Sequence, residues 1–161
     1  MFPLILISLK EHHNLFKKIS HNSYLIEEGI KGSYDSFENK QLTEKVWEII
    51  EPIYLKKTQN LVNSFKNAKA SSSGSDDLAQ ITMAAFENRV ETILIEADRI
   101  IPGKIDYNTG KIELGDIKDP DFDDILDDLA ELVLKKRGEV VVLPKESMPS
   151  DAGIAAIYRY K

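Results

Sequence analysis

The sequence predicts an α/β layered domain with a mainly parallel sheet in the second half of the chain. Helical and strand patterns alternate after residue 75, which favours strands connected by helices. Three apolar runs in that half, residues 90–96, 139–143 and 154–158, lack polar alternation, so both faces of their sheet must be covered. The 161 residues are 42% hydrophobic and 30% charged, which is typical of a folded globular chain.

The first half predicts a short strand followed by helices. Residues 3–8 form a continuous apolar run, typical of a strand that is buried on both faces, and residues 11–19 have a helical pattern. Apolar residues recur at helical spacing over residues 41–65, which predicts one long helix or two, with Trp47 on the packed face. Pro52 lies inside this pattern and has no backbone donor, so we expect a kink near it.

The two halves are separated by small and polar residues at 68–75, which predict a flexible connection. They also differ in charge, because residues 1–70 contain 10 basic and 8 acidic side chains, whereas residues 71–161 contain 11 and 19. We therefore expect two parts. Residues 1–70 form a strand and helical segment, and residues 76–161 form the α/β domain.

The second half begins with a helix over residues 76–88. Asp76 and Asp77 are placed to cap the N-terminus of this helix and to complement its positive end. After the strand at 90–96, residues 104–114 alternate about an Asn-Thr-Gly turn, which predicts a hairpin at the surface.

The clearest helix in the chain begins near Phe122 and ends before Gly138, and strands at 139–143 and 154–158 follow it. Its apolar spacing predicts that the side chains of Ile125, Leu129 and Val133 are buried.

Composition and motifs exclude several classes of function. The net charge of −6 opposes a general attraction to nucleic acid or anionic membranes. The longest apolar stretch, residues 2–9, is too short to cross a bilayer and lacks the features of a secretory signal, so we expect a cytoplasmic protein. Cysteine is absent, and the sequence contains neither a glycine-rich phosphate loop nor a nucleophile elbow. We therefore expect no enzymatic activity and no cofactor.

Acidic residues before the last helix resemble the start of a calcium loop. Asp119, Asp121 and Asp123 alternate as calcium ligands do, but Asp124 and Ala130 occupy the sixth and twelfth places, where that loop needs Gly and Glu. We interpret the run as a solvated helix N-terminus, and a hydrolase using carboxylate-bound magnesium is a weaker alternative. Two of the three histidines are adjacent on a helix and point apart, so no metal site is predicted from them.

Five segments of the second half occur in a recognisable order: Ala84–Ile95, Asp127–Glu131, Gly138–Pro144, Met148–Pro149 and Gly153–Tyr160. In this order they resemble the C-terminal domain of bacterial proteins related to archaeo-eukaryotic peptide release factors. They are similar also to the third domain of class-1 release factors and of Pelota, whose α/β/α sandwich resembles the kink-turn-binding ribosomal proteins. The resemblance implies an α/β/α sandwich with a mainly parallel or mixed sheet, preceded by an N-terminal strand and long helices.

The first half resembles the stretch just before that domain. There the strand at 3–8 and its following helix would close a preceding ribonuclease H-like domain, so the resemblance implies that this chain is a C-terminal portion of a longer protein.

The resemblance does not imply catalysis, because the Gly-Gly-Gln tripeptide that release factors use for peptidyl-tRNA hydrolysis is missing from the sequence. It implies a non-enzymatic, translation-related module that docks a translational GTPase or the ribosome. An acidic face suits a protein partner better than RNA, because phosphate would be repelled. The candidate partner-binding residues are Asp121, Asp124, Asp127, Asp128 and Glu131.

An RNA-binding domain of the kink-turn-binding type is the alternative function. It needs a basic, glycine-containing loop that faces RNA. Four dispersed cations near the predicted strand ends, Arg89, Lys145, Arg159 and Lys161, are a weak signal for such a surface, so we expect weak or no RNA binding.

Overall fold

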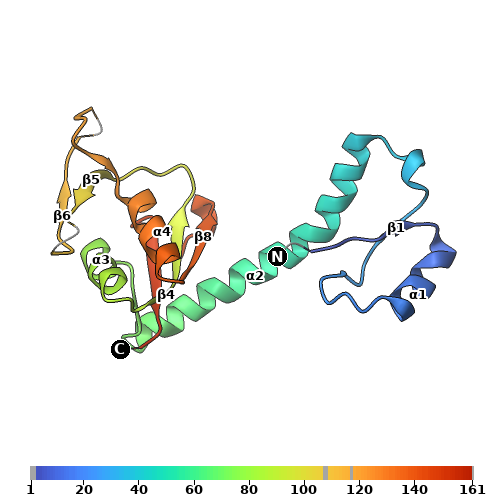
Figure 1. The fold of residues 1–161 in the computed structure, drawn as a ribbon, viewed down its shortest axis with the longest axis horizontal. Helices are drawn as coiled ribbons and strands as arrows, with labels where there is room; N and C mark the ends of the chain where they lie inside the picture. Colours follow the sequence, from blue (N-terminus) through green and yellow to red (C-terminus); the bar gives the residue numbers. More distant parts are fainter. Residues whose placement is uncertain (1–2, 107–108, 117, 161) are drawn as a thin grey trace. The chain divides into compact units, whose positions relative to one another are not determined.

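A computed structural model describes residues 3–106, 109–116 and 118–160. The chain divides into two compact units, Met1–Lys57 and Thr58–Lys161. The boundary between them falls within one long helix, α2 (Asn39–Ala70), which Figure 1 shows as a continuous ribbon. Each unit is described by itself below.

The first unit is built around a pair of short parallel strands, β1 (Ile7–Ser8) and β2 (Ile30–Lys31), with helix α1 (Lys10–Ile19) between them in sequence. A 3₁₀ turn, η1 (Tyr34–Ser36), precedes α2. The buried His13 ring connects α1 to both strands, because its Nε2 lies 3.0 Å from the carbonyl oxygen of Ser8 and 3.2 Å from that of Ile30. Two carbonyl acceptors require that this nitrogen has the hydrogen.

The expectation of a strand over residues 3–8 that is buried on both faces is wrong. Only Ile7 and Ser8 form a strand, and Leu4 makes an isolated bridge to Leu25 while its side chain stays 48% exposed. Burial of both faces requires layers packed above and below the strand, whereas the backbone hydrogen bonds to residues 24–32 pair only one edge of the run. An apolar run alone does not distinguish a buried strand from a partly exposed one.

Helix α2 is one helix of 32 residues and continues through Pro52, whose expected kink stays a prediction. The interpretation of Trp47 as a packed residue is wrong, because its side chain is 53% exposed. The fully covered positions of α2 are Thr58 and Phe65, which belong to the second unit, whereas Trp47 belongs to the first. Helical spacing gave the correct element here but not the residues that it buries.

The second unit contains a mixed four-stranded sheet. Its strand order is β3 (Gly74–Ser75), β9 (Ile154–Tyr158), β4 (Val90–Glu96), β8 (Glu139–Leu143). Strands β4 and β8 are parallel, and β9 is antiparallel to both β4 and β3. The predicted strands at 90–96, 139–143 and 154–158 are thus confirmed.

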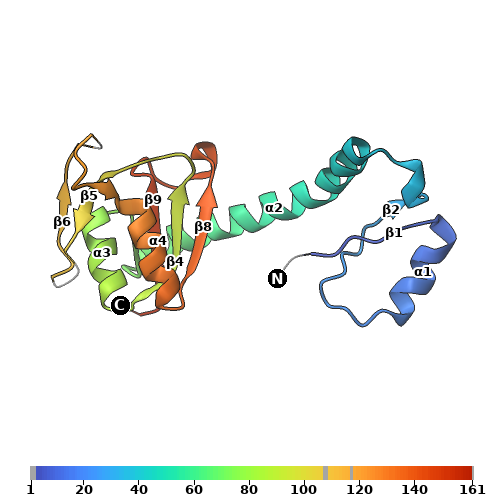
Figure 2. The ribbon, with the colours of Figure 1, turned by 45° about the horizontal axis from the view of Figure 1, so that its top comes forward.

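Helices cover both faces of this sheet (Figures 1 and 2). Helices α3 (Leu78–Phe86) and α4 (Ile125–Lys135) pack on one face, where Ile81 and Leu129 contact the core around Ile93 and Ile154. On the other face, Phe65 of α2 packs in a second cluster with Leu94, Leu143 and Ala155. The α/β/α sandwich is confirmed, and so is the predicted burial of Ile125, Leu129 and Val133.

A second, smaller sheet lies at one end of this unit, with the order β6 (Ile112–Leu114), β5 (Pro102–Ile105), β7 (Asp123–Asp124). Strands β5 and β6 confirm the predicted hairpin, although Tyr107 and Asn108 in its turn lie outside the described residues. A Cβ at Gly103 would lie 2.3 Å from Cδ1 of Ile125, so the backbone of β5 lies directly on the first turn of α4.

The serine-rich segment after α2 is not the flexible connection that we expect from its composition. The amide of Ser73 donates to the carbonyl of Ala68 at 2.8 Å, and Gly74 and Ser75 form β3, which pairs with β9. Small residues permit this pairing, because a Cβ at Gly74 would lie 2.8 Å from the carbonyl oxygen of Ala156. The segment therefore ends α2 and adds an edge strand.

None of the helices in the described parts of the chain is long and apolar enough to span a membrane.

Candidate docking surface

The candidate surface is organised by the N-terminus of helix α4, which Asp124 caps. Its Oδ1 accepts hydrogen bonds from the amides of Leu126 at 3.1 Å and of Ile101 at 3.0 Å. One half-buried carboxylate thus satisfies a free amide of the helix and also holds the segment that follows β4. The sequence signal was an Asp directly before the apolar helical pattern.

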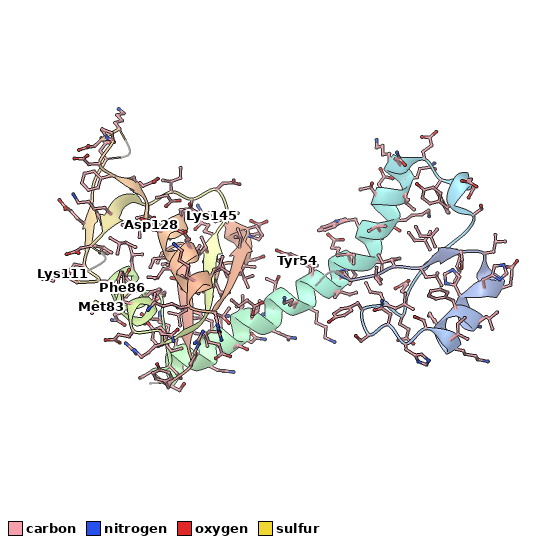
Figure 3. All side chains as sticks on the ribbon, in the orientation of Figure 1. Tyr54, Met83, Phe86, Lys111, Asp128 and Lys145 are labelled. Atoms are coloured by element: carbon pink, nitrogen blue, oxygen red, sulfur yellow. The ribbon has the colours of Figure 1, made fainter. Side chains whose placement is uncertain are left out.

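Three carboxylates project from the first two turns of α4, and we call Asp127, Asp128 and Glu131 the acidic face. Asp127 and Glu131 are exposed and four residues apart, so they share one side of the helix. Asp128 is half-buried, makes an interaction within the protein, and is labelled on α4 in Figure 3. Glu131 forms an exposed ion pair with Lys135 at 2.7 Å, which contributes little stability. The acidic face therefore presents negative charge to solvent.

Asp121 does not lie on α4. It is exposed in the turn before β7, where its amide donates to Oδ1 of Asp119 at 3.1 Å. The residues of the calcium-like run thus stabilise a turn and a helix start. Within residues 3–106, 109–116 and 118–160, no three His, Asp or Glu side chains are grouped so that they could hold a metal ion.

A hollow of about 130 Å³ lies between α4 and strand β8, at the outer side of the sheet. Asp124 and Asp127 both line it, so the structure brings these two candidate residues to one place. Its other lining residues are Ile95, Arg99, Leu126, Ala130, Val140 and Val142. Sequence reasoning missed the two valines and the arginine, because their position depends on the strand order.

Arg99 is fixed at the end of this hollow by two partners. Its Nη1 donates to Oε2 of Glu96 at 2.9 Å and to the carbonyl oxygen of Asp151 at 2.8 Å. Glu96 ends strand β4 and is 9% exposed, so the guanidinium balances a nearly buried carboxylate. Gly153 has φ of +77°, and a Cβ there would lie 2.3 Å from Cδ of Arg99, which explains the glycine.

Two of the four cations near the strand ends make contacts within the domain. Arg89 forms an ion pair with Glu87 at 2.6 Å and lies over the ring of Tyr158, with 5.4 Å to the ring centre. Burial raises the pKa of the Tyr158 phenol above its ordinary value. Arg159 donates to Oδ1 of Asn88 at 3.3 Å and to the carbonyl oxygen of Lys136 at 3.1 Å. Lys145 is exposed after β8 (Figure 3), and Lys161 lies outside the described residues.

Gly110, at the start of the second strand side of the hairpin, is held against α3. Gly110 lies against Met83 and Phe86, so a Cβ at this glycine would be 3.0 Å from the Met83 sulfur. Figure 3 shows Met83, Phe86 and Lys111 grouped at this contact. The small sheet thus packs on the sandwich at two places, through Gly103 on α4 and through Gly110 on α3.

A second cavity, of about 500 Å³, lies in the first unit and is rich in lysine. Its charged lining comes from Lys10, Lys17, Lys31 and Lys45, with Glu28 and Glu48. Lys17 donates to the carbonyl oxygen of Glu27. This cavity has a net positive lining, in contrast to the hollow beside α4.

The sequence model of bacterial archaeo-eukaryotic release factor family 3 matches residues 1–89, which is more than half of the chain. The chain belongs to this family. The match covers the first unit, α2 and α3, whereas most of the segments that resemble release factors follow it, between residues 90 and 160. No curated protein sequence matches this family 3 chain.

Solved structures share the fold of this family 3 chain. The C-terminal domain of a peptide chain release factor from Methanosarcina mazei superposes with a TM-score of 0.57 and 23% identity, covering 80% of this chain and 98% of that one. Pelota from Archaeoglobus fulgidus gives a TM-score of 0.51 and 16% identity, covering 99% of this chain and 49% of its own. A model of ribosome-bound archaeal Pelota and ABCE1 gives a TM-score of 0.56 and 17% identity, covering 94% of this chain and 40% of that one.

This family 3 chain therefore spans about half of the Pelota chains or less. At these identities the likeness establishes the fold, and it confirms the predicted resemblance to release-factor C-terminal domains.

Proposed function

We propose that this family 3 chain is a non-enzymatic, translation-related docking module whose acidic face binds a basic patch on a translational GTPase or on a ribosomal protein. The observation behind the proposal is the division of α4, which buries Ile125, Leu129 and Val133 while Asp127 and Glu131 face solvent. Family membership and the fold shared with a ribosome-bound Pelota support the translational context.

Electrostatics favour a protein partner over RNA at this surface. Residues 71–161 contain 19 acidic and 11 basic side chains, so phosphates that approach the sandwich are repelled. A basic protein surface is instead attracted, and such complementarity raises association rates and selects partners. We also propose that the module has no metal and no catalytic step of its own.

The expected parts are residues 1–70 and 76–161, but residues 58–75 pack with the second unit. The proposal is therefore that the first unit, residues 1–57, closes a preceding domain. Several large apolar side chains of the first unit are exposed, which is unusual for a part that folds alone. They include Leu15, Phe16, Ile19, Tyr24, Trp47 and Leu55.

RNA binding is the second candidate function, and the lysine-lined cavity of the first unit favours it. Lys10, Lys31 and Lys45 have no ion pair among the described residues, so their charges are available to phosphate. This candidate places RNA on the first unit and not on the acidic sandwich. Lys10→Glu/Lys31→Glu would then reduce RNA binding and leave protein docking unchanged.

The docking proposal is tested by reversing charge on the acidic face. Asp127→Lys/Glu131→Lys should lower co-sedimentation with bacterial ribosomes, or capture of a purified translational GTPase, by about tenfold at low salt. Added salt should weaken wild-type binding, because the charges are exposed. Glu44→Lys/Glu51→Lys on α2 makes the same charge change and serves as the control. Equal binding by wild type and both variants contradicts the proposal.

A further inference from the structure

Strand β8 is an edge strand whose outer side has no partner among the described residues. It ends the order β3-β9-β4-β8, and it pairs only with β4. Exposed edges offer free amides and carbonyls to another chain, and proteins usually cover them or place charge on them. The outer edge of β8 is apolar over Val140–Val142.

The register with β4 identifies which backbone groups point outward. Leu143 is opposite Glu96, and the carbonyl oxygen of Leu143 accepts from the amide of Ala97 at 2.8 Å. In a parallel ladder, both backbone groups of a residue point to the same side, and the side alternates along the strand. The backbone N–H and C=O groups of Val141 therefore point toward β4, as those of Leu143 do. The backbone N–H and C=O groups of Val140 and Val142 point to the open edge.

The side chains of these two residues lie beside the acidic face. Val140 and Val142 line the hollow together with Ala130 of α4, and Val142 is 57% exposed. The hollow of about 130 Å³ is comparable to cavities that hold one small apolar group. Asp127 lines the same hollow, so an apolar floor and a carboxylate are next to two free pairs of backbone groups.

We propose that β8 accepts an extended peptide segment of a partner protein as a fifth strand. Two apolar side chains at alternate positions would cover Val140 and Val142, and a Lys or Arg side chain would reach Asp127. Main-chain hydrogen bonds provide affinity in this binding mode, and alternate side chains provide specificity. The inference rests on the proposed docking function and names its binding mode.

Charge favours this occupant over a second copy of the chain. Two copies paired through β8 would bring the acidic faces of both α4 helices toward one another, in a part of the chain with 19 acidic and 11 basic residues. A basic peptide meets the same carboxylates with opposite charge. The proposed occupant is therefore an extended segment with alternating apolar residues and at least one cation.

The probe is a blocked octapeptide, acetyl-Ser-Lys-Ser-Val-Ser-Val-Ser-Lys-amide, labelled for fluorescence anisotropy and titrated with the full chain. In an added strand, only alternate amides face the receiving edge. N-methylation of one alternate set, the two Val or the two central Ser residues, should lower affinity about tenfold, because two hydrogen bonds are lost. Methylation of the other set should change it less than about twofold. Equal effects of the two sets overturn the inference.

Protein variants locate the strand. Val142→Pro removes an outward amide that β4 does not use, and proline is tolerated at such edge positions. It should lower peptide affinity about threefold, because one hydrogen bond is lost, whereas Val142→Thr, which keeps the amide, should not. Asp127→Lys should weaken the Lys peptide and strengthen a matched Glu peptide. If Val142→Pro unfolds, which urea unfolding will show, the methylated peptides still decide.

The outcomes separate this inference from the docking proposal. If peptide affinity depends on which alternate set of amides is methylated, but the chain binds neither ribosomes nor the GTPase, strand addition is supported and the proposed function is contradicted. Loss of ribosome or GTPase binding in the acidic-face variant, with no dependence on the methylated set, supports docking and overturns strand addition. A dimer in sedimentation that Val142→Pro abolishes shows that a second copy occupies the edge, and it also overturns the inference.

Discussion

Leu129 is the residue at which burial and the helix pattern agree most directly. It is fully buried between α4 and the sheet, so Leu129→Ala should lower the free energy of unfolding by about 2 to 5 kcal/mol through loss of contacts and cavity formation. Leu134 on the same helix is 58% exposed, and Leu134→Ala should change the free energy of unfolding by less than about 0.5 kcal/mol. Urea unfolding of both variants measures the difference, and similar losses would show that the faces of α4 are misassigned.

Sequence reasoning at this scale succeeds where a neighbouring residue decides the outcome. Asp77 caps α3 as predicted, because its side chain accepts the amide of Gln80 only three positions away at 2.8 Å. Trp47 is exposed although its spacing predicts burial, because burial depends on what covers α2 and not on spacing within the helix. The contact between Glu96 and Arg99 was not predictable from the sequence, because Arg99 is also held by the carbonyl oxygen of Asp151, which is distant in sequence.

At the scale of elements, an ion pair connects the end of α2 to the start of α3. Lys69 Nζ lies 2.6 and 2.7 Å from the two carboxylate oxygens of Asp76, and this hydrogen bonding to Lys69 holds the pKa of Asp76 below its usual 3.8, against the opposing effect of burial. Because the pKa of Asp76 is lower in the folded state, the ion pair stabilises the fold at pH values above the pKa of the unfolded state. This stabilisation is lost as the pH falls through the pKa of the folded state. The pair is partly exposed, so its contribution at pH 7 should stay below about 1 kcal/mol.

Lys69→Met should therefore lower the urea midpoint at pH 7 and have a smaller effect at an acidic pH below the lowered pKa of Asp76, where the Asp76 carboxylate is protonated. Lys66→Met, which changes an exposed lysine of the same helix, is the control. An equal effect of Lys69→Met at both pH values would mean that packing of the lysine stem, and not its charge, stabilises this connection.

The elements themselves were largely predictable, and their partners were not. Runs rich in apolar and β-branched residues predicted β4, β8 and β9 within a residue, because strands that are covered on both faces need such side chains. The same reasoning overestimated residues 3–8, whose side chains stay exposed or half-buried because the two faces of this run are not both covered. Small residues at 68–75 predict a linker, yet Gly74 and Ser75 pair with β9, because composition does not reveal the strand beside which a glycine lies.

The whole chain should neither hydrolyse peptidyl-tRNA nor cleave RNA, and it should bind mixed RNA weakly. The sequence has no Gly-Gly-Gln, and its net charge of −6 opposes contact with phosphate. Nitrocellulose binding at about 150 mM salt, with magnesium present, should give no affinity stronger than the nonspecific range of roughly 10⁻⁴ to 10⁻⁶ M. A release assay on loaded ribosomes should give no product. Sub-micromolar affinity would favour the RNA-binding candidate on the lysine-lined cavity.

Acidic residues at a helix start are visible in the sequence, and four of the five expected carboxylates cap α4 or lie on it. Two of these, Asp124 and Asp127, line the hollow. The hollow beside them is formed by Val140 and Val142, and their outward direction follows from the position of β8 at the sheet edge. Strand order is a property of the complete fold, and no local pattern in the sequence encodes it.

The central position of β9 constrains the order in which the second unit can form during synthesis. Strand β4 leaves the ribosome well before Ile154–Tyr158 exists, yet β9 pairs with β4 on one side and β3 on the other. Until β9 is made, β4 has an open, apolar edge, and β3 has no partner strand. A nascent chain at that stage is exposed to aggregation, and a chain cut before Ile154 keeps that exposure permanently.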